Sequence, residues 1–219
     1  MKIEEVLWIG GAQWAGKSTV ANLLAARYPL VRYAFDYHDA RSHSERVKAS
    51  PNRFPAFNTF LAALDIDPDS VWADPAPEAM AEHALRIFAE RFELVLEDIV
   101  ALPEGTRLLA EGWGLRPNLI APYLPSSEHA VFLVPTDEFR EQQLATVARA
   151  GSLGITELRN PERAQRNRVE RDRILAADVV EQATRLGLPV IHVDGSEHEG
   201  QVATRVETQF RPYLPTWLY

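Results

Sequence analysis

The eight residues from Gly11 to Ser18, GAQWAGKS, restrict the fold of this chain more than any other segment. They match the pattern G-x-x-x-x-G-K-[ST] without a mismatch, directly after the apolar run Val6 to Ile9 and at the start of a helical pattern from Lys17 to about Arg27. Glycines let the backbone N–H groups of such a loop converge on a phosphate, and the following helix adds the positive end of its dipole. The motif therefore predicts a nucleoside triphosphate site, and the flanking strand and helix argue against a glycine-rich turn that matches by chance.

The loop pattern also indicates which residues contact the nucleotide. We expect Lys17 to reach the β- and γ-phosphates and Ser18 to ligate Mg²⁺, with Thr19 as a further hydroxyl. The predicted nucleotide contacts are Gly11, Ala12, Gln13, Trp14, Ala15, Gly16, Lys17, Ser18 and Thr19. Switches, motors and kinases share such a site, so the rest of the chain must indicate the reaction. The chain has no N-K-x-D guanine motif, which argues against a GTPase. Its third predicted strand ends in a single carboxylate instead of Asp-Glu, which argues against a large motor ATPase.

Four more short apolar runs predict strands, with helix-length patterns between them. The runs are Val31 to Phe35, Arg107 to Ala110, Ala130 to Val134 and Val190 to Val193. Strands covered on both faces are compact apolar runs, and strands that alternate with helices form parallel sheets with right-handed crossovers. We therefore expect an α/β fold, a doubly wound parallel sheet, in a single domain spanning residues 1–219.

The interval between the second and third predicted strands is longer than one crossover helix requires. Its second half, from Ala76 to Leu102, is typical of a long helix with Asp74 as its N-cap. The first half, residues 36–74, holds seven acidic and four basic residues together with several aromatic ones. We interpret residues 37–106 as an inserted substrate-binding segment. Its acidic, aromatic character favours a neutral or cationic ring-containing acceptor, such as a nucleoside, sugar or antibiotic.

Two carboxylates follow predicted strands at the edge of the sheet where ligands bind in open α/β folds. Asp36 ends the second strand, nineteen positions after Lys17, and is placed to accept the proton of an attacking hydroxyl; the alternative is a turn or N-cap aspartate. Glu111 ends the third strand and would hold Mg²⁺ or bind a substrate hydroxyl; the alternative is a solvated acid. The remaining candidate acceptor contacts are His38, Trp113 and Arg116, the last with a surface salt bridge as an equal alternative.

Residues 159–173 hold six arginines and three acids in a chain whose formal net charge is −8. Asn160 as N-cap and Pro161 at the first helical position predict the start of a helix. Guanidinium groups that converge on triphosphate oxygens neutralise charge during transfer, and closure over the site excludes water. We interpret residues 151–173 as an arginine-rich lid; the alternative is an exposed helix with i, i+4 ion pairs, such as Arg166 with Glu170.

The order of these features resembles that of the P-loop small-molecule kinases of the nucleoside monophosphate kinase-like fold, especially the chloramphenicol phosphotransferase and zeta-toxin branch. The resemblance covers the phosphate loop, Asp36, Glu111, the arginine-rich helix and the VDGS sequence that closes the fifth strand. It implies a three-layer fold with a five-stranded sheet in the order 2-3-1-4-5, and Asp36 as the catalytic base. It also implies that adenine lies between the lid and the loop of Gly195 and Ser196. The resemblance implies that the catalytic lid arginines are drawn from Arg163, Arg166 and Arg171, beside the Lys17 that the phosphate loop itself supplies.

Together these features predict transfer of the ATP γ-phosphoryl group, with Mg²⁺, to a hydroxyl of a small molecule. The alternative is a nucleotide-binding regulatory module that phosphorylates no small molecule. The net charge of −8 argues against a nucleic-acid partner or an acidic membrane surface, and there is no run of about 18 apolar residues to span a membrane. The chain contains no cysteine, which fits a reducing compartment, so we expect a cytoplasmic protein.

Overall fold

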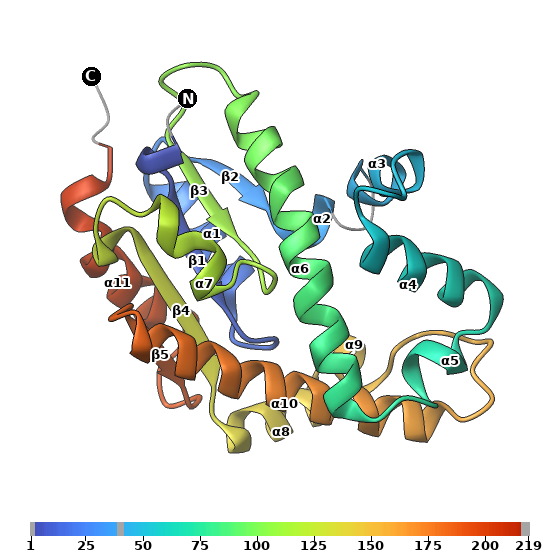
Figure 1. Cartoon of the computed structure of the whole chain (residues 1–219). Helices are drawn as coiled ribbons and strands as arrows, with labels where there is room; N and C mark the ends of the chain where they lie inside the picture. The colour runs from blue at the N-terminus through green and yellow to red at the C-terminus, as the bar shows by residue number, and fades with distance from the viewer. Residues whose placement is uncertain (1–2, 39–41, 216–219) are drawn as a thin grey trace.

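The computed structural model describes residues 3–38 and 42–215, which form a parallel five-stranded sheet flanked by helices (Figure 1). The strands are β1 (Leu7–Gly11), β2 (Val31–Ala34), β3 (Leu108–Glu111), β4 (Ala130–Pro135) and β5 (Val190–Val193). They lie in the order β2-β3-β1-β4-β5, and each neighbouring pair is parallel. The predicted α/β fold class and sheet order are therefore confirmed.

Helices cover both faces of the sheet, because successive side chains of each strand point to opposite faces. Trp8 and Phe132 belong to one buried cluster, and Ile9 and Val131 belong to the other. The first cluster is covered by α6 (Pro77–Val100), α7 (Pro117–Ile120) and α10 (Pro161–Arg185), and the second by α1 (Lys17–Arg27) and α11 (Glu199–Phe210). This arrangement leaves the carboxyl ends of the strands at one open edge.

Three helices that follow β2 lie to one side of the sheet, beyond α6 (Figure 1). They are α3 (Ser44–Ala49), α4 (Pro55–Ile66) and α5 (Asp69–Trp72), and together with α6 we call them the helical lobe. The lobe has a hydrophobic core of its own, in which Phe54 and Phe57 pack with Ile87 and Leu94 of α6. The short helix α2 (Phe35–His38) connects β2 to this lobe.

The two long helices begin at prolines. The N-cap of α6 is Ala76 and not the predicted Asp74, because Pro77 takes the first helical position. The start of α10 is as predicted, since Asn160 Oδ1 accepts a hydrogen bond of 3.1 Å from the backbone N–H of Arg163. The other helices are η1 (Ile3–Glu5), η3 (Ala121–Tyr123), η4 (Ser127–His129), α8 (Asp137–Thr146), α9 (Ala148–Gly151) and η5 (Arg211–Tyr213). Within the described ranges, no helix has the length and apolar character needed to cross a membrane.

Candidate functional site

The phosphate-loop motif lies between β1 and α1 and has a backbone geometry that depends on its glycines. Gly11 has a φ of 122°, and a Cβ atom there would lie 2.1 Å from the carbonyl oxygen of Leu133 on β4. Gly16 has a φ of 76° at the N-cap of α1. Glycine adopts these conformations without the strain that other residues incur. Trp14 also has a positive φ, 65°, so the loop holds a large side chain in a conformation that it rarely adopts.

Lys17 is buried in the loop, with 5% of its surface exposed. Its Nζ donates a hydrogen bond of 2.6 Å to the carbonyl oxygen of Ala12. Burial lowers the pKa of Lys17, whereas the nearby carboxylates of Asp36 and Glu111 act in the opposite direction. The structure therefore brings this ammonium group and the two candidate carboxylates into one electrostatic neighbourhood.

Ser18, at the start of α1, and Glu111, at the end of β3, are in contact. Ser18 Oγ donates a hydrogen bond of 3.0 Å to Glu111 Oε2, and Arg32 on β2 donates to Glu111 Oε1. Glu111 is 1% exposed, so these donors stabilise a charge that water does not reach. A hydroxyl and a carboxylate are oxygen ligands of the kind that bind Mg²⁺ beside phosphate groups. The donor set therefore fits the predicted magnesium site.

Asp36 and His38 lie in α2, directly after β2. The side chain of Asp36 is exposed, and its carboxylate is close enough to Lys17 to affect the pKa of that group. His38 stacks on Tyr33 of β2, with ring centroids 4.5 Å apart, and burial lowers the pKa of its imidazole. One turn of helix thus places Asp36 near the phosphate loop and packs His38 against the sheet.

Arg171, on the buried face of α10, is the candidate lid arginine that reaches the interior. Its guanidinium carbon lies 5.0 Å from the ring centroid of Trp72 and 5.2 Å from that of Trp113. Nη2 and Nε donate hydrogen bonds of 2.6 and 3.0 Å to Asp172, and the charge of Asp172 in turn acts on Lys17. Arg171 therefore connects the helical lobe with the surroundings of the phosphate loop.

Arg163 and Arg166, the other two candidate lid arginines, lie on exposed parts of α10. Arg163 Nη2 donates a hydrogen bond of 3.3 Å to the carbonyl oxygen of Asp74. Arg166 Nη1 is 3.9 Å from Glu162, which is an i, i+4 ion pair of the kind expected on an exposed helix. Their contacts are therefore with the segment between α5 and α6 and with α10 itself.

Trp113 and Arg116 both follow β3 but have different surroundings. The Trp113 ring meets Phe88 of α6 edge to face, with centroids 4.6 Å apart. Arg116 is 1% exposed and donates hydrogen bonds to Asp178 and, at 2.8 Å, to the carbonyl oxygen of Leu175. Burial lowers the pKa of Arg116, and Asp178 opposes that effect. Arg116 thus fastens the segment after β3 to α10 from within, instead of forming a surface salt bridge.

Gly195 and Ser196 form a tight turn after β5. Gly195 has a φ of 83°, and a Cβ atom there would lie 2.7 Å from the ring of Phe139 on α8. The backbone N–H and the hydroxyl of Ser196 donate hydrogen bonds of 2.9 and 2.6 Å to Asp194 Oδ1. The turn follows the carboxyl end of its strand, as the phosphate loop follows β1, while its contact with adenine stays a prediction.

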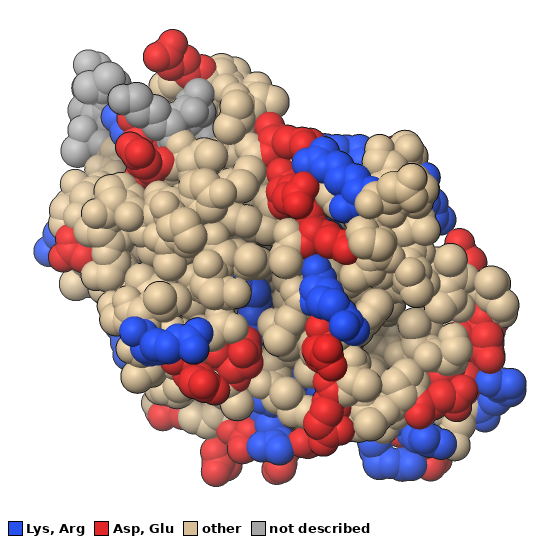
Figure 2. All heavy atoms as spheres, in the orientation of Figure 1, with Lys and Arg blue, Asp and Glu red and all other residues tan. Residues whose placement is uncertain are grey.

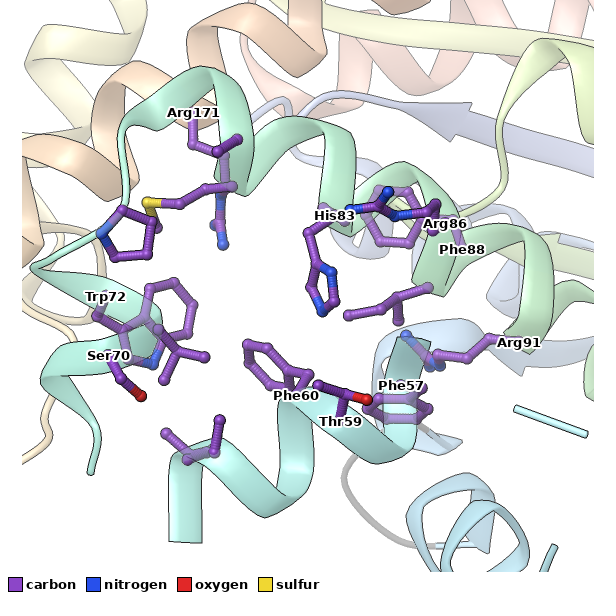
Figure 3. Close-up of a pocket in the computed structure, with 18 of the residues that line it drawn as sticks. Phe57, Thr59, Phe60, Ser70, Trp72, His83, Arg86, Phe88, Arg91 and Arg171 are labelled. Atoms are coloured by element: carbon purple, nitrogen blue, oxygen red, sulfur yellow. The ribbon is translucent and has the colours of Figure 1, made fainter. Parts of the chain in front are cut away.

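A cavity of about 520 Å³ lies between the helical lobe, α10 and the segment after β3 (Figure 3). Its walls are mainly apolar, and Arg171 enters it from α10. Arg171 also binds Asp172, whose charge acts on Lys17. The aromatic rings that line it are those of Phe57, Phe60, Trp72, Phe88 and Trp113.

Sequence reasoning missed two arginines, Arg32 and Arg168. Arg32 is the charged residue of an otherwise apolar strand, and such an isolated charge indicates an ionic partner nearby. The partner is Glu111. The Arg168 guanidinium carbon lies 5.5 Å from the ring centroid of Trp14, and its nitrogens donate to carbonyl oxygens of Ala150 and Ser152. Arg168 lies at helical spacing from the buried apolar residues of α10, and this spacing places its side chain on the buried face of the helix.

Comparison with known proteins finds similarity at the level of structure. No protein-family model matches this chain, and no curated protein sequence matches it. A shikimate kinase from Acinetobacter baumannii in complex with shikimate shares 15% identity at a TM-score of 0.48, over 94% of this chain and 93% of that chain. TT1252 from Thermus thermophilus shares 18% identity at a TM-score of 0.50, over 93% of this chain and 95% of that chain. The similarity to TT1252 extends along nearly the whole of both chains. Together with the sheet order, it is a similarity of fold.

Proposed function

We propose that this protein is an ATP- and Mg²⁺-dependent phosphotransferase that moves the γ-phosphoryl group to a hydroxyl group of a small molecule. The observation that carries the proposal is that the phosphate loop, Asp36 and Glu111 lie together at the carboxyl edge of the sheet, where both carboxylates act on Lys17. Asp36 acts on Lys17, and Arg171 links the cavity wall to Asp172, which also acts on Lys17. A nucleotide on the loop and an acceptor in the cavity would be neighbours, as phosphoryl transfer requires.

The residues take distinct roles in this proposal. The loop N–H groups, the start of α1 and Lys17 would bind the phosphates of ATP. Asp36 would accept the proton of the acceptor hydroxyl as its oxygen attacks the γ-phosphorus. Arg163 and Arg166 would contribute positive charge when the lid, residues 151–173, closes over the nucleotide. We assign Arg171 to the acceptor, because it lines the cavity and Asp172 already holds two of its nitrogens.

Ser18 and Glu111 would hold Mg²⁺, with Arg32 keeping the Glu111 carboxylate in place. The ion, when bound, neutralises charge on the phosphate oxygens. His38 and Trp113 would border the acceptor, and Gly195 with Ser196 would border adenine. The narrower proposal, a place in the chloramphenicol phosphotransferase and zeta-toxin branch, depends on the sequence resemblance.

Asp36→Asn tests the proposal, because it keeps the shape of the side chain and removes its basicity. We expect turnover to fall roughly 10²- to 10⁴-fold while ATP still binds. Asp65→Asn is the matched control, since Asp65 is exposed and pairs with Lys48. The assay incubates each protein with Mg-ATP and an extract of metabolites and antibiotics, and mass spectrometry detects ATP-dependent gains of one phosphate.

Two outcomes would overturn parts of this proposal. Unchanged transfer by the Asp36→Asn variant would remove Asp36 from the mechanism. Tight ATP binding by the unaltered protein without any phosphorylated product across a broad extract would instead favour the regulatory module, in which ATP changes the conformation that a partner reads.

A further inference from the structure

The charged side chains that line the cavity beside the helical lobe have partners within the chain. Arg171 is held by Asp172, with Nη2 2.6 Å from Oδ1. Arg86 lies 3.2 Å from Glu82, one helical turn away on α6. Burial lowers the pKa of His83, so its imidazole is uncharged at neutral pH. These side chains therefore offer a ligand little unpaired charge.

The hydroxyl groups of the lining are engaged in a similar way. Thr59 Oγ1 donates a hydrogen bond of 2.7 Å to the carbonyl oxygen of Pro55, and Ser70 Oγ donates one of 2.6 Å to that of Asp67. The indole Nε1 of Trp72 is buried, so it does not reach the cavity. A ligand with many hydroxyl groups would therefore exchange its hydrogen bonds to water for few hydrogen bonds to the walls, and each group left unpaired costs free energy.

The rest of the lining is apolar and largely aromatic (Figure 3). Phe60, Trp72 and Trp113 line the cavity and are only partly buried. The ring of Phe60 meets that of Trp72 edge to face, with centroids 6.0 Å apart. A ligand that covers such rings gains free energy in proportion to the apolar surface removed from water. The walls therefore favour a ligand with a large apolar face.

The outer surface does not add a charge of one sign. On the face that Figure 2 shows, acidic and basic side chains lie beside one another and do not gather into one large patch of either sign. Arginines of the lobe pair with its own carboxylates, as Arg53 does with Glu93. Long-range steering of a charged ligand requires a field of one sign, so we attribute binding in the cavity to its apolar walls.

One wall of the cavity contacts Phe35, the residue that precedes Asp36. Arg91, which lines the cavity, donates a hydrogen bond of 3.2 Å to the carbonyl oxygen of Phe35, and its guanidinium carbon lies 3.7 Å from the centroid of that ring. Phe88, also in the lining, meets the same ring edge to face at 6.3 Å. Trp113 comes from the segment directly after β3. A ligand in the cavity therefore lies beside the carboxyl ends of β2 and β3.

We infer that the acceptor is a mainly apolar, ring-containing alcohol, which the cavity selects by its apolar surface, and that sugars and other polyols are excluded. The inference rests on the proposed function in treating the cavity as the acceptor site. It narrows the expected range of nucleosides, sugars and antibiotics to compounds whose ring body carries few polar groups. The rings would lie against Phe60, Trp72 and Trp113, and the hydroxyl group would face Asp36.

Three neutral alcohols test this preference without any phosphoryl transfer. 2-Naphthalenemethanol and glucose contain the same number of non-hydrogen atoms but differ in apolar surface, and benzyl alcohol has a single aromatic ring. Isothermal titration calorimetry at neutral pH and without nucleotide measures the binding of each. We expect 2-naphthalenemethanol to bind about ten-fold or more tightly than benzyl alcohol, because the second ring buries additional apolar surface. Glucose should show no binding at millimolar concentrations.

Ala63→Trp tests the place of binding, because Ala63 lines the cavity from α4 and a larger side chain there fills it without removing a contact. We expect the affinity for 2-naphthalenemethanol to fall about ten-fold or more. Ala62→Trp is the matched control, since Ala62 is the adjacent residue of the same helix, is exposed and lies outside the lining. This variant should keep the affinity of the unaltered protein. An equal loss in both variants, or a loss in neither, would show that the cavity is not the binding site and would overturn the inference.

The order of affinities in the unaltered protein tests the inference by itself, even where a variant does not fold. Glucose that binds as tightly as 2-naphthalenemethanol contradicts it, and so do equal affinities for the two aromatic alcohols or a lack of binding by all three at millimolar concentrations. Failure of the proposed function gives a different result. An apolar preference in calorimetry with no phosphorylated product in the presence of Mg-ATP would refute the transferase and leave the ligand class standing, whereas phosphorylated sugars would support the transferase and refute the ligand class.

Discussion

Asp98 of α6 makes a half-buried cluster of contacts that joins the helical lobe to β2 of the sheet. Tyr33 of β2 donates a hydrogen bond of 2.8 Å to it, His43 Nε2 lies 2.9 Å from it, and Arg46 Nη1 of α3 lies 2.5 Å from it. Burial raises the pKa of Asp98, but the hydrogen bonds from His43, Tyr33 and Arg46 outweigh burial and lower the pKa to about 2. Since α2 carries Asp36, this cluster also supports the candidate site.

The contribution of the Asp98 charge to the free energy of unfolding follows from that pKa. A decrease from 3.8 to about 2 corresponds to roughly 2.5 kcal/mol at about 1.36 kcal/mol per pH unit. The side chain is 23% exposed, and screening by solvent brings our expectation down to about 2 kcal/mol. Asp98→Asn should therefore lower the free energy of unfolding by about 2 kcal/mol at neutral pH.

The pH dependence has a definite sign. A carboxylate whose pKa is lowered in the folded state stabilises the protein above its unfolded pKa, and that stability is lost as the pH falls through the folded value. The difference between the unaltered protein and Asp98→Asn should therefore shrink as the pH falls from about 4 to about 2 and vanish below about pH 2. Urea unfolding followed by circular dichroism across this range measures it.

The control for this prediction is Asp65→Asn. Asp65 is exposed and lies 3.4 Å from Lys48, so its replacement should cost less than about 0.5 kcal/mol at any pH. A deficit in Asp98→Asn that is the same at neutral and acid pH would show that shape, and not charge, is responsible. The absence of a deficit at neutral pH would refute the role of the cluster altogether.

Two further predictions concern the phosphate loop and the magnesium site. Gly11→Ala places a Cβ atom 2.1 Å from the Leu133 carbonyl oxygen at a φ of 122°, so we expect unfolding measurements to show a loss of more than about 3 kcal/mol and calorimetry to show no ATP binding. Gly105→Ala is the control, because Gly105 has a positive φ but open space around an added Cβ atom. We expect this variant to lose only about 1 kcal/mol of unfolding free energy. A loss equal to that of Gly11→Ala would contradict the steric argument. Glu111→Gln should raise the Mg²⁺ concentration for half-maximal binding of a fluorescent ATP analogue about ten-fold, and an unchanged requirement would remove Glu111 from the magnesium site.

The sheet could be predicted from the sequence because each strand is a separate apolar run between recognisable helix patterns. The ends of the strands differ by one or two residues, for physical reasons. β1 continues to Gly11, because the glycine still pairs with Leu133 of β4 before the loop turns. β2 stops at Ala34, because Phe35 already begins α2. The sheet order itself came from the resemblance to known kinases and not from the strands.

The candidate site could be predicted only where a local pattern specifies a position. The phosphate loop is such a pattern, and the carboxylates Asp36 and Glu111 follow from the rule that strand ends share one edge. The arginines of α10 had no comparable rule, because composition does not separate inward from outward side chains. Arg168 and Arg171 are buried while Arg163 and Arg166 are exposed, and this division depends on how α10 packs against α5, α6 and β4.

The same reasoning explains why the summed charge of the inserted segment is a poor guide to the residues that line the cavity. On α6, Met80 and Arg91 are three helical turns apart and line the cavity, whereas Glu90, Glu93 and Glu97 recur at helical spacing on another face. The helical spacing of these residues can be read from the sequence. The sequence does not indicate, however, which face of α6 packs against α4 and α5 and which face forms ion pairs with arginines at the surface. Those contacts join residues that are distant along the chain. The charged groups that line a cavity therefore depend on the packing of its walls, and the summed charge of a segment does not determine them.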